Sequence, residues 1–306
     1  MAVPERPWHF IVNPAAGGGR ARRRWRTLLP RLRRDLPGMT FEVSTPATTL
    51  ADLAHQAVRR GQHSIVSVGG DGTHHHILNA LVRARALGRT VLAPLSLGSG
   101  NDWIRSLGTP RAYAPWLARL KQGTVRTQMV GRIVFEDSGK THYFLNVLGM
   151  AYDADVVQIA AEEGVRGRLG YALLAAAYLK EYEAPSVELH FDGGSFNGRV
   201  HTINVGIGRN SGGGMSFVPH ADPFGSDLAL TYATRLPAYR VLLNSWRLYN
   251  GSIGSLRALS QVHSKTVRAT QQRGVLRIEA DGEYLGSGNV RIDILPERLS
   301  VLASVT

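Results

Sequence analysis

Three times in the first 110 residues, an apolar run leads into a glycine-rich stretch that residues with helical spacing follow. Strands and helices that alternate at this spacing predict a mainly parallel sheet with helices on both faces. Because the carboxyl ends of parallel strands share one edge, we expect the three stretches to meet there. We therefore predict a Rossmann-like α/β domain over residues 1–127. The stretches are Gly17-Gly18-Gly19, Gly69-Gly70-Asp71-Gly72-Thr73 and Gly98-Ser99-Gly100-Asn101-Asp102.

Glycine stretches that open helices are typical of phosphate sites. Glycine lets the backbone approach a phosphate closely, and a helix N-terminus offers unpaired N–H groups. The common nucleotide signatures are not present, since Gly19 leads into Arg20-Ala21-Arg22 instead of the Lys-Ser/Thr of a P-loop, and no stretch reads Gly-x-Gly-x-x-Gly. A single stretch of this kind is a simple turn as often as it is a phosphate site. Three at one edge favour a phosphate-bearing ligand.

The pattern changes after about residue 123, where short β-rich segments follow one another, separated by turns such as Asp192-Gly193-Gly194. This pattern predicts an antiparallel β-sandwich domain over residues 128–291. A C-terminal segment of about 292–306 is allowed to return to the first domain. The expected strands are 128–135, 141–147, 186–191, 200–206, 228–233, 274–279 and 290–295, with helices at 169–183 and 238–248.

Composition limits the chemistry and the partners of the chain. There is no cysteine among the 306 residues, which excludes disulfides, thiolate metal sites and thiol catalysis. The formal net charge of +13 favours polyanions: phosphorylated ligands, nucleic acid or an anionic membrane surface. Neither a signal-peptide pattern nor a run of about 18 apolar residues occurs, so a cytoplasmic protein is expected.

Several motifs resemble the catalytic domain of diacylglycerol kinases and related bacterial lipid kinases, which include sphingosine and ceramide kinases and, more distantly, NAD kinases. They occur in the family's order over essentially the whole chain. In the first half they are Asn13-Pro14, the 69–73 stretch and Leu97-Gly98-Ser99-Gly100-Asn101-Asp102. In the second half they are Phe144-Leu145-Asn146-Val147-Leu148-Gly149-Met150, Gly212-Gly213-Gly214-Met215 with Pro219 and Ala221, and Ala280-Asp281-Gly282-Glu283.

The resemblance implies an ATP-dependent kinase of phospholipid metabolism that phosphorylates the hydroxyl of a diacylglycerol-like lipid, in a cleft between the two domains. It makes Glu283 the general base and places Asp71 among the catalytic residues. ATP and Mg²⁺ are the implied cofactors. Such chemistry needs backbone N–H groups, a metal and a carboxylate near the acceptor. The implied ATP-binding residues are Asn13, Thr45, Gly69, Gly70, Asp71, Gly72, Thr73, His74, His75 and Ser99.

The sequence departs from the family pattern at two important positions. His76 stands where the family usually has glutamate, so an acid is replaced by a titratable base. The family also has an Asp-Gly step whose aspartate holds a supporting Mg²⁺, but here Gly225 occupies that position. Asp222 and Asp227 are close enough to substitute as oxygen donors, so the candidate metal site is Asp222, Gly225 and Asp227.

The three consecutive histidines from His74 to His76 do not predict a metal site, because helical ligands need i, i+3 or i, i+4 spacing. We expect one to face the ligand and the others to pack. The eight arginines of the 20–34 segment form either a solvated helix face or a contact for anionic phospholipid. We expect transient contact of this Arg20 to Arg34 region with the inner face of the membrane. The apolar 169–183 segment is either a core helix or a wall of an acyl-chain pocket.

Two other functions remain open. A kinase for a soluble acceptor, similar to NAD kinases, would share the Gly-Gly-Asp-Gly-Thr element. A polyanion-binding protein would explain the charge, but the sequence has no RNP motif or KH loop, so no nucleic acid is expected as partner. The identity of the lipid acceptor is not predicted, and a homodimer is left open.

Overall fold

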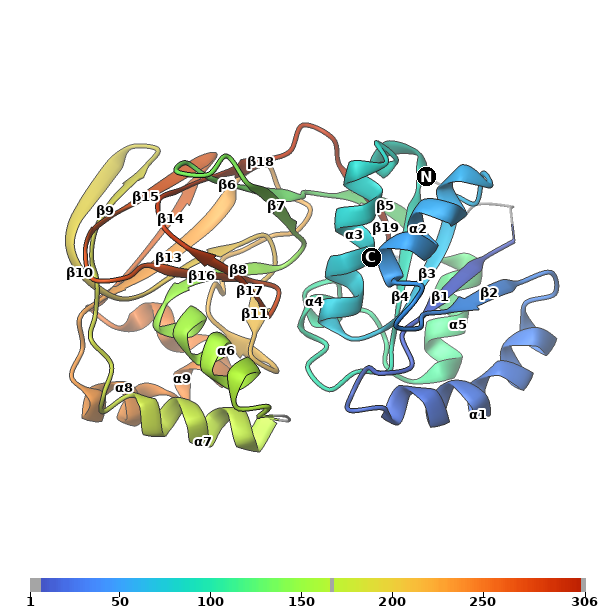
Figure 1. Cartoon of the computed structure of the whole chain (residues 1–306), viewed down its shortest axis with the longest axis horizontal. Coiled ribbons are helices and arrows are strands. Elements are labelled where there is room, and N and C mark those ends of the chain that lie inside the picture. The colour runs from blue at the N-terminus through green and yellow to red at the C-terminus, as the bar shows by residue number, and fades with distance from the viewer. Residues whose placement is uncertain (1–6, 166–167, 304–306) are drawn as a thin grey trace. The chain divides into compact units, whose positions relative to one another are not determined.

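The computed structural model describes residues 7–165 and 168–303, which form two compact units (Figure 1). The first unit contains the residues up to Val130 and those from Pro296 on, and the second is Gly131–Leu295. No helix within the described ranges is both long and apolar enough to cross a membrane.

The first unit is built on a six-stranded sheet in which the predicted parallel arrangement is confirmed. Neighbouring strands are parallel, except that the C-terminal strand is antiparallel to the strand at the edge of the sheet beside it. The spatial order is β2 (Thr40–Val43), β1 (His9–Val12), β3 (Ser64–Gly69), β4 (Val91–Ser96), β19 (Leu299–Ala303) and β5 (Thr124–Gln128). Strands β1 and β3 are buried along their whole length, as expected for a parallel sheet covered on both faces.

Alternate residues of each strand point to opposite faces of the sheet, so buried strands place apolar side chains on both faces, and helices cover them. On one face, the ring centroid of Phe10 lies 5.9 Å from that of Trp25 and 6.5 Å from that of Trp116. The intervening residues Ile11 and Ile65 are fully buried as well. The helical elements are α1 (Arg20–Asp35), α2 (Leu50–Arg59), α3 (Asp71–Arg83), η1 (Leu87–Arg89), α4 (Asp102–Ser106) and α5 (Tyr113–Gln122).

The second unit is an antiparallel β domain, as predicted. Its central strand is β10 (Gly194–Gly206), which pairs with β9 (Ser186–Phe191) through its first half and with β8 (Val147–Ala151) and β13 (Leu228–Thr234) through its second. This long strand joins the two parts of the sheet. The other strands are β6 (Gly131–Phe135), β7 (Thr141–Phe144), β11 (Asn210–Ser211), β12 (Met215–Ser216), β14 (Leu259–Ser264), β15 (Thr266–Arg273), β16 (Arg277–Ala280), β17 (Glu283–Ser287) and β18 (Val290–Ile294).

The helices of the second unit differ in extent from the prediction. The helix expected at 169–183 is α7 (Arg168–Tyr178), which ends five residues earlier. The helix expected at 238–248 is divided into α8 (Ala238–Asn244) and α9 (Arg247–Asn250), followed by η2 (Ser252–Ser255). Helix α6 (Tyr152–Glu162) was not predicted; it begins directly after β8, and its Tyr152 and Val156 pack against α7.

Candidate active site

The three glycine stretches of the first unit meet where β1, β3 and β4 end. The N–H groups of Leu97 and Gly98 both donate to the carbonyl of Gly69, at 2.8 and 2.9 Å. A Cβ on Gly98 would lie 2.5 Å from the Cα of Gly70, so only glycine permits this approach. A Cβ on Gly17 would lie 3.2 Å from the carbonyl oxygen of Leu97. The backbones of all three stretches are therefore in close proximity.

Asp71 joins two of these stretches. It is the first residue of α3, yet its carboxylate accepts hydrogen bonds from the start of α4: Oδ2 from the N–H of Asn101 (2.7 Å), and Oδ1 from the N–H groups of Asp102 (2.9 Å) and Trp103 (3.1 Å). A Cβ on Gly100 would lie 2.7 Å from Asp71 Oδ2. Asp71 thus fixes the third stretch against the second by capping a helix that is distant in sequence.

Together with the 69–73 stretch after β3, the other residues assigned to the nucleotide follow four adjacent strands. Asn13 follows β1, and its amide Nδ2 donates to the Thr73 hydroxyl at 3.0 Å. Thr45 follows β2, where its hydroxyl accepts the N–H of Thr48 at 3.0 Å. Ser99 follows β4 and is exposed. These residues lie at the carboxyl ends of the strands in the order β2-β1-β3-β4, the edge at which α/β proteins bind ligands.

The histidines of α3 are mostly core residues. His74 is fully buried, with its Nδ1 2.5 Å from the Ser67 hydroxyl and its ring centroid 5.1 Å from that of Trp103. Burial lowers the pKa of His74 to about 3, so the ring is neutral at physiological pH. His75 is only 5 % exposed. His76 is the exposed member of the three.

In the second unit, the Ala-Asp-Gly-Glu motif forms the turn between β16 and β17. Asp281 has a left-handed backbone conformation, with φ at 55°. Its carboxylate accepts the N–H groups of Leu145 and Asn146, each at 2.9 Å, and its own N–H donates to the carbonyl of Val147 at 2.9 Å. This places Glu283 at the first position of β17, where it is partly exposed.

Two acids that the sequence reasoning missed lie next to this turn, Glu279, which is buried, and Asp153, which is partly exposed. Glu279 is 2 % exposed, and its Oε2 accepts the N–H of Gly282 at 2.9 Å. Burial raises the pKa of Glu279 well above its usual value, and the nearby Asp153 raises it further. Burial also raises the pKa of Asp153 to about 6, against the hydrogen bonds it accepts from Thr202 and Asn204. No sequence motif marks either acid.

Asn146 connects the turn to the glycine-rich loop of the second unit. Its carbonyl accepts the N–H groups of Ile207 and Gly208, each at 2.8 Å, and its side-chain amide donates to the carbonyl of Asn210. Since Asn146 N–H also donates to Asp281, one residue holds both the Asp-Gly-Glu turn and the start of the loop that contains Gly212, Gly213 and Gly214. The second-half motifs are therefore parts of one local structure.

Residues 7–133 match the diacylglycerol kinase catalytic domain, and residues 146–303 match the YegS C-terminal NAD kinase beta sandwich-like domain. The chain belongs to the diacylglycerol kinase catalytic-domain family. A probable lipid kinase YegS-like protein of Pseudomonas putida is 30 % identical over 251 residues, 81 % of this chain and 79 % of that protein. The diacylglycerol kinase of Bacillus subtilis is 28 % identical over 220 residues, 69 % of this chain and 68 % of that protein.

Solved structures share the fold of this family member. A diacylglycerol kinase from Bacillus anthracis str. Sterne superposes with a TM-score of 0.71 at 19 % identity, covering 98 % of this chain and 97 % of that one. An NAD kinase from Archaeoglobus fulgidus in complex with ATP gives a TM-score of 0.53 at 15 % identity, covering 97 % and 94 %. At these identities the likeness concerns the fold.

The loop predicted to hold a supporting Mg²⁺ contributes few ligands in this diacylglycerol kinase family member. Asp222 is exposed, and its Oδ1 accepts the N–H of Phe224 at 3.0 Å. Asp227 Oδ2 accepts the Ser226 hydroxyl at 3.2 Å. Gly225 has no side chain to add. In the part of the chain that the structure describes, no group of three or more His, Asp or Glu side chains could hold a metal ion.

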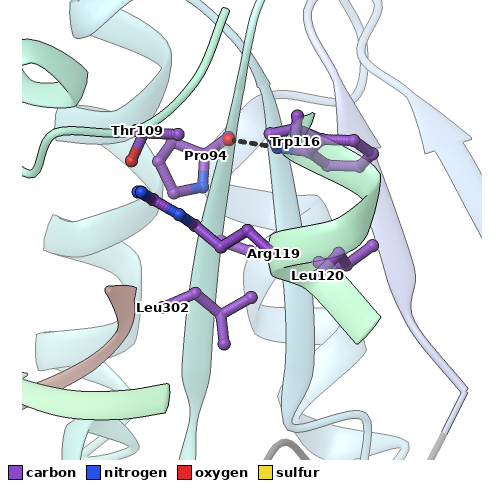
Figure 2. Close-up of a pocket in the computed structure, with 7 residues that line it drawn as sticks. Pro94, Thr109, Trp116, Arg119, Leu120 and Leu302 are labelled. Atoms are coloured by element: carbon purple, nitrogen blue, oxygen red, sulfur yellow. Dashed lines mark hydrogen bonds between the residues drawn. The ribbon is translucent and has the colours of Figure 1, made fainter. Parts of the chain in front are cut away.

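A small pocket of the first unit lies apart from these motifs (Figure 2). In Figure 2 the Arg119 side chain extends toward Thr109, and the indole N–H of Trp116 donates to the carbonyl of Pro94 at 2.9 Å. Burial lowers the pKa of Arg119. None of the residues assigned to the nucleotide or the acceptor lines this pocket, so it has no part in the candidate site. The lining residues are Ala93, Pro94, Thr109, Trp116, Arg119, Leu120 and Leu302.

Proposed function

We propose that this protein is an ATP-dependent kinase that transfers the γ-phosphate to a hydroxyl of a diacylglycerol-like membrane lipid. Membership of the diacylglycerol kinase family gives the reaction class. The observation that carries the proposal is the convergence of three glycine stretches at one sheet edge, because closely approaching backbone suits a polyphosphate better than a bulky apolar ligand.

The nucleotide side of the proposal uses the strand ends of the first unit. Asn13, Thr45, Thr73 and Ser99 would contact ATP together with the backbone of the 69–73 stretch. Asp71 would act by holding Asn101 to Trp103 in place, since its two oxygens accept three N–H groups. His74 and His75 would support the site from the core, because their rings are buried.

The acceptor side of the proposal assigns Glu283 as general base. Its carboxylate would take the proton of the lipid hydroxyl while the hydroxyl oxygen bonds to the γ-phosphorus and the bond to the β–γ bridging oxygen breaks. The products are ADP and a lipid phosphate. Mg²⁺ accompanying ATP would neutralise phosphate charge. A second, supporting Mg²⁺ would depend on Asp222, Asp227 and water, and metal analysis of the purified protein tests it.

The proposed setting is the cytoplasmic face of a membrane. The arginines of α1 are all exposed, whereas its Trp25 and Leu32 are buried in the first unit. An exposed row of positive charge suits transient attraction to anionic headgroups. An NAD-kinase-like activity is the second candidate, because the NAD kinase structure shares the fold over nearly the whole chain.

Phosphate transfer from labelled ATP, with Mg²⁺ and a panel of mixed-micelle lipids, tests the proposed function. We expect Glu283→Gln to lower kcat by about 10²-fold or more, since an amide cannot accept the proton. Asp71→Ala should also lose activity. Glu297→Gln, at an exposed position outside the site, is the matched control and should retain it. Full activity of Glu283→Gln, or transfer to NAD alone, would contradict the proposal.

A further inference from the structure

Helix α7 has an apolar side that the described residues of its unit leave exposed. One side packs inward: Tyr171, Leu174 and Ala175 belong to a cluster with α6. On the other side Leu169 is 74 % exposed and Leu173 64 % exposed, and the alanines between and beyond them are exposed too. The sequence predicted that the 169–183 segment is either a core helix or a wall of an acyl-chain pocket. Both alternatives therefore apply only to the inner side of α7.

Helices α8 and α9 extend this apolar surface. Ala238 and Val241 of α8 pack in the same cluster as the inner side of α7, so the two helices are neighbours (Figure 1). Within the described ranges, every large apolar side chain that is more than half exposed lies on α7, α8, α9 or the link between the last two. Single exposed apolar residues are ordinary, but such a group marks an interaction surface. Its members, here named the α7–α9 surface, are Leu169, Leu173, Tyr239, Leu242, Leu243, Trp246 and Tyr249.

The α8–α9 part of this surface carries basic charge only. Residues 238–250 contain Arg240 and Arg247 and neither Asp nor Glu, whereas Glu181 and Glu183 follow α7. Both basic side chains lie over aromatic rings of the surface: Arg247 is 5.0 Å from the ring centroid of Trp246, and Arg240 is 6.0 Å from that of Tyr239.

The inner side of α7 also lies near the proposed general base. Burial raises the pKa of Tyr171 to about 12, and the negative charges of Glu279 and Glu283 add to this shift. Tyr171 belongs to the cluster on which α7 packs, opposite the exposed Leu173. One short helix therefore separates the α7–α9 surface from the residue expected to activate the lipid hydroxyl.

We propose that the α7–α9 surface inserts its apolar side chains into the interface of an anionic lipid bilayer. Leucine with tryptophan and tyrosine, flanked by arginine, is the composition of helices that lie in the plane of a membrane. The inference rests on the proposed function, which requires the protein to reach a lipid in the bilayer. It differs from the role given to α1, whose large apolar residues are buried or partly buried against the first unit and which offers mainly charge.

Trp246 provides an internal probe of this insertion. The protein has five tryptophans, and the other four, Trp8, Trp25, Trp103 and Trp116, are at most 6 % exposed, whereas Trp246 is 55 % exposed. Vesicles of phosphatidylcholine and phosphatidylglycerol with brominated acyl chains should quench and blue-shift the fluorescence of the wild type. Trp246→Phe should bind vesicles but show neither change. Vesicle binding without quenching would overturn the proposal, as would no binding or a blue shift that depends only on protein concentration, which indicates a second copy as occupant.

A paired substitution separates docking from catalysis. Leu242→Ser/Leu243→Ser should weaken sedimentation with the same vesicles by about tenfold or more, because two leucines no longer enter the interface. Val43→Ser/Val275→Ser, at exposed positions outside the surface, should bind like the wild type. Equal binding by both pairs would refute the surface.

The same pair of variants distinguishes failure of the surface from failure of the proposed function. Transfer of phosphate to a short-chain diacylglycerol dissolved as monomers should be equal in wild type and Leu242→Ser/Leu243→Ser. Loss of that activity would show that the leucines act on catalysis or folding, and would overturn the docking role. If the wild type docks through Trp246 but phosphorylates no lipid, the proposed function fails and the surface stands.

Discussion

At the scale of single residues, Asp71 shows how one side chain can hold two glycine stretches together. The sequence places it at the start of a helix, where a capping role for its own helix is expected. In the structure it caps α4 instead, 30 residues further along the chain. A motif gives the residue type, but the partner depends on the third glycine stretch lying against the second, which only the folded sheet brings about.

Replacing Asp71 with asparagine should therefore destabilise the first unit. The amide oxygen can accept N–H groups, but the amide nitrogen would face a backbone N–H of residues 101–103, leaving a buried donor unpaired. We expect the free energy of unfolding to fall by about 1–3 kcal/mol. Urea denaturation followed by tryptophan fluorescence measures this.

Asp52→Asn is the matched control, because Asp52 is also a capping acid but is exposed at the start of α2. Its effect should be smaller. An equal loss of stability for the two substitutions would show that the link between the second and third glycine stretches adds nothing beyond ordinary capping.

The histidines show the limit of sequence reasoning at this scale. Their spacing argued against a helical metal site, but it could not indicate which ring is buried. That outcome depends on Ser67 in β3 and Trp103 in α4, which come from different parts of the chain. The fully buried His74 is neutral for the same reason, whereas His76 is exposed.

At the scale of elements, the turn from β16 to β17 determines where Glu283 lies. Asp281 holds this turn through two hydrogen bonds to the segment between β7 and β8 while its backbone has a φ of 55°. Aspartate and asparagine tolerate this conformation better than other residues with a side chain. The motif is thus explained by geometry as much as by chemistry.

Asp281→Ala should lower both stability and activity more than Asp281→Asn does. Alanine loses both hydrogen bonds and adopts the left-handed conformation at a cost of about 1 kcal/mol or more. Asparagine retains one acceptor. Urea denaturation and kinase assays on the two variants provide the comparison, and equal effects would contradict the anchoring role of the carboxylate.

Elements were predicted well where apolar spacing decides them, and poorly where tertiary contacts do. Strands β1, β3 and β4 are apolar and lie between glycine turns, so their existence followed from the sequence. Strand β15 contains Thr-Gln-Gln-Arg and was missed, since its exposed residues are polar and resemble a loop. Helix α7 was predicted, but its apolar residues on all sides could not indicate which side would be covered.

At the scale of the whole molecule, the two units contain different sets of titratable groups whose pKa values are shifted by burial. The first contains His74, whose pKa is lowered to about 3 by burial. The second contains His201, with a pKa lowered to about 4 by burial, and also Asp153, with a pKa raised to about 6. As pH falls below about 6.5, a buried neutral histidine makes the folded protein less stable, because only the unfolded chain takes up the proton. A raised aspartate pKa has the opposite effect between about pH 6 and 4.

The first unit should therefore be the more acid-sensitive, since in the second unit Asp153 and Glu279 oppose His201. Glu279 adds to the opposition because burial raises its pKa as well. Both acids bind protons more tightly in the folded state than in the unfolded chain, so acidification stabilises the folded state. Sequence analysis could not provide this contrast, because it depends on which ionisable side chains are buried.

Urea denaturation at pH 7 and pH 5 measures this acid sensitivity in the Trp246→Phe background, where all remaining tryptophans belong to the first unit. The urea concentration at the midpoint of unfolding should be lower at pH 5 than at pH 7. The decrease is expected because His74 is protonated only in the unfolded chain between about pH 6.5 and 3. Adding Ser67→Ala/His74→Leu should reduce that fall, and removing both hydrogen-bond partners together leaves neither unpaired. If the added pair leaves the fall unchanged, the acid sensitivity of the first unit does not come from His74.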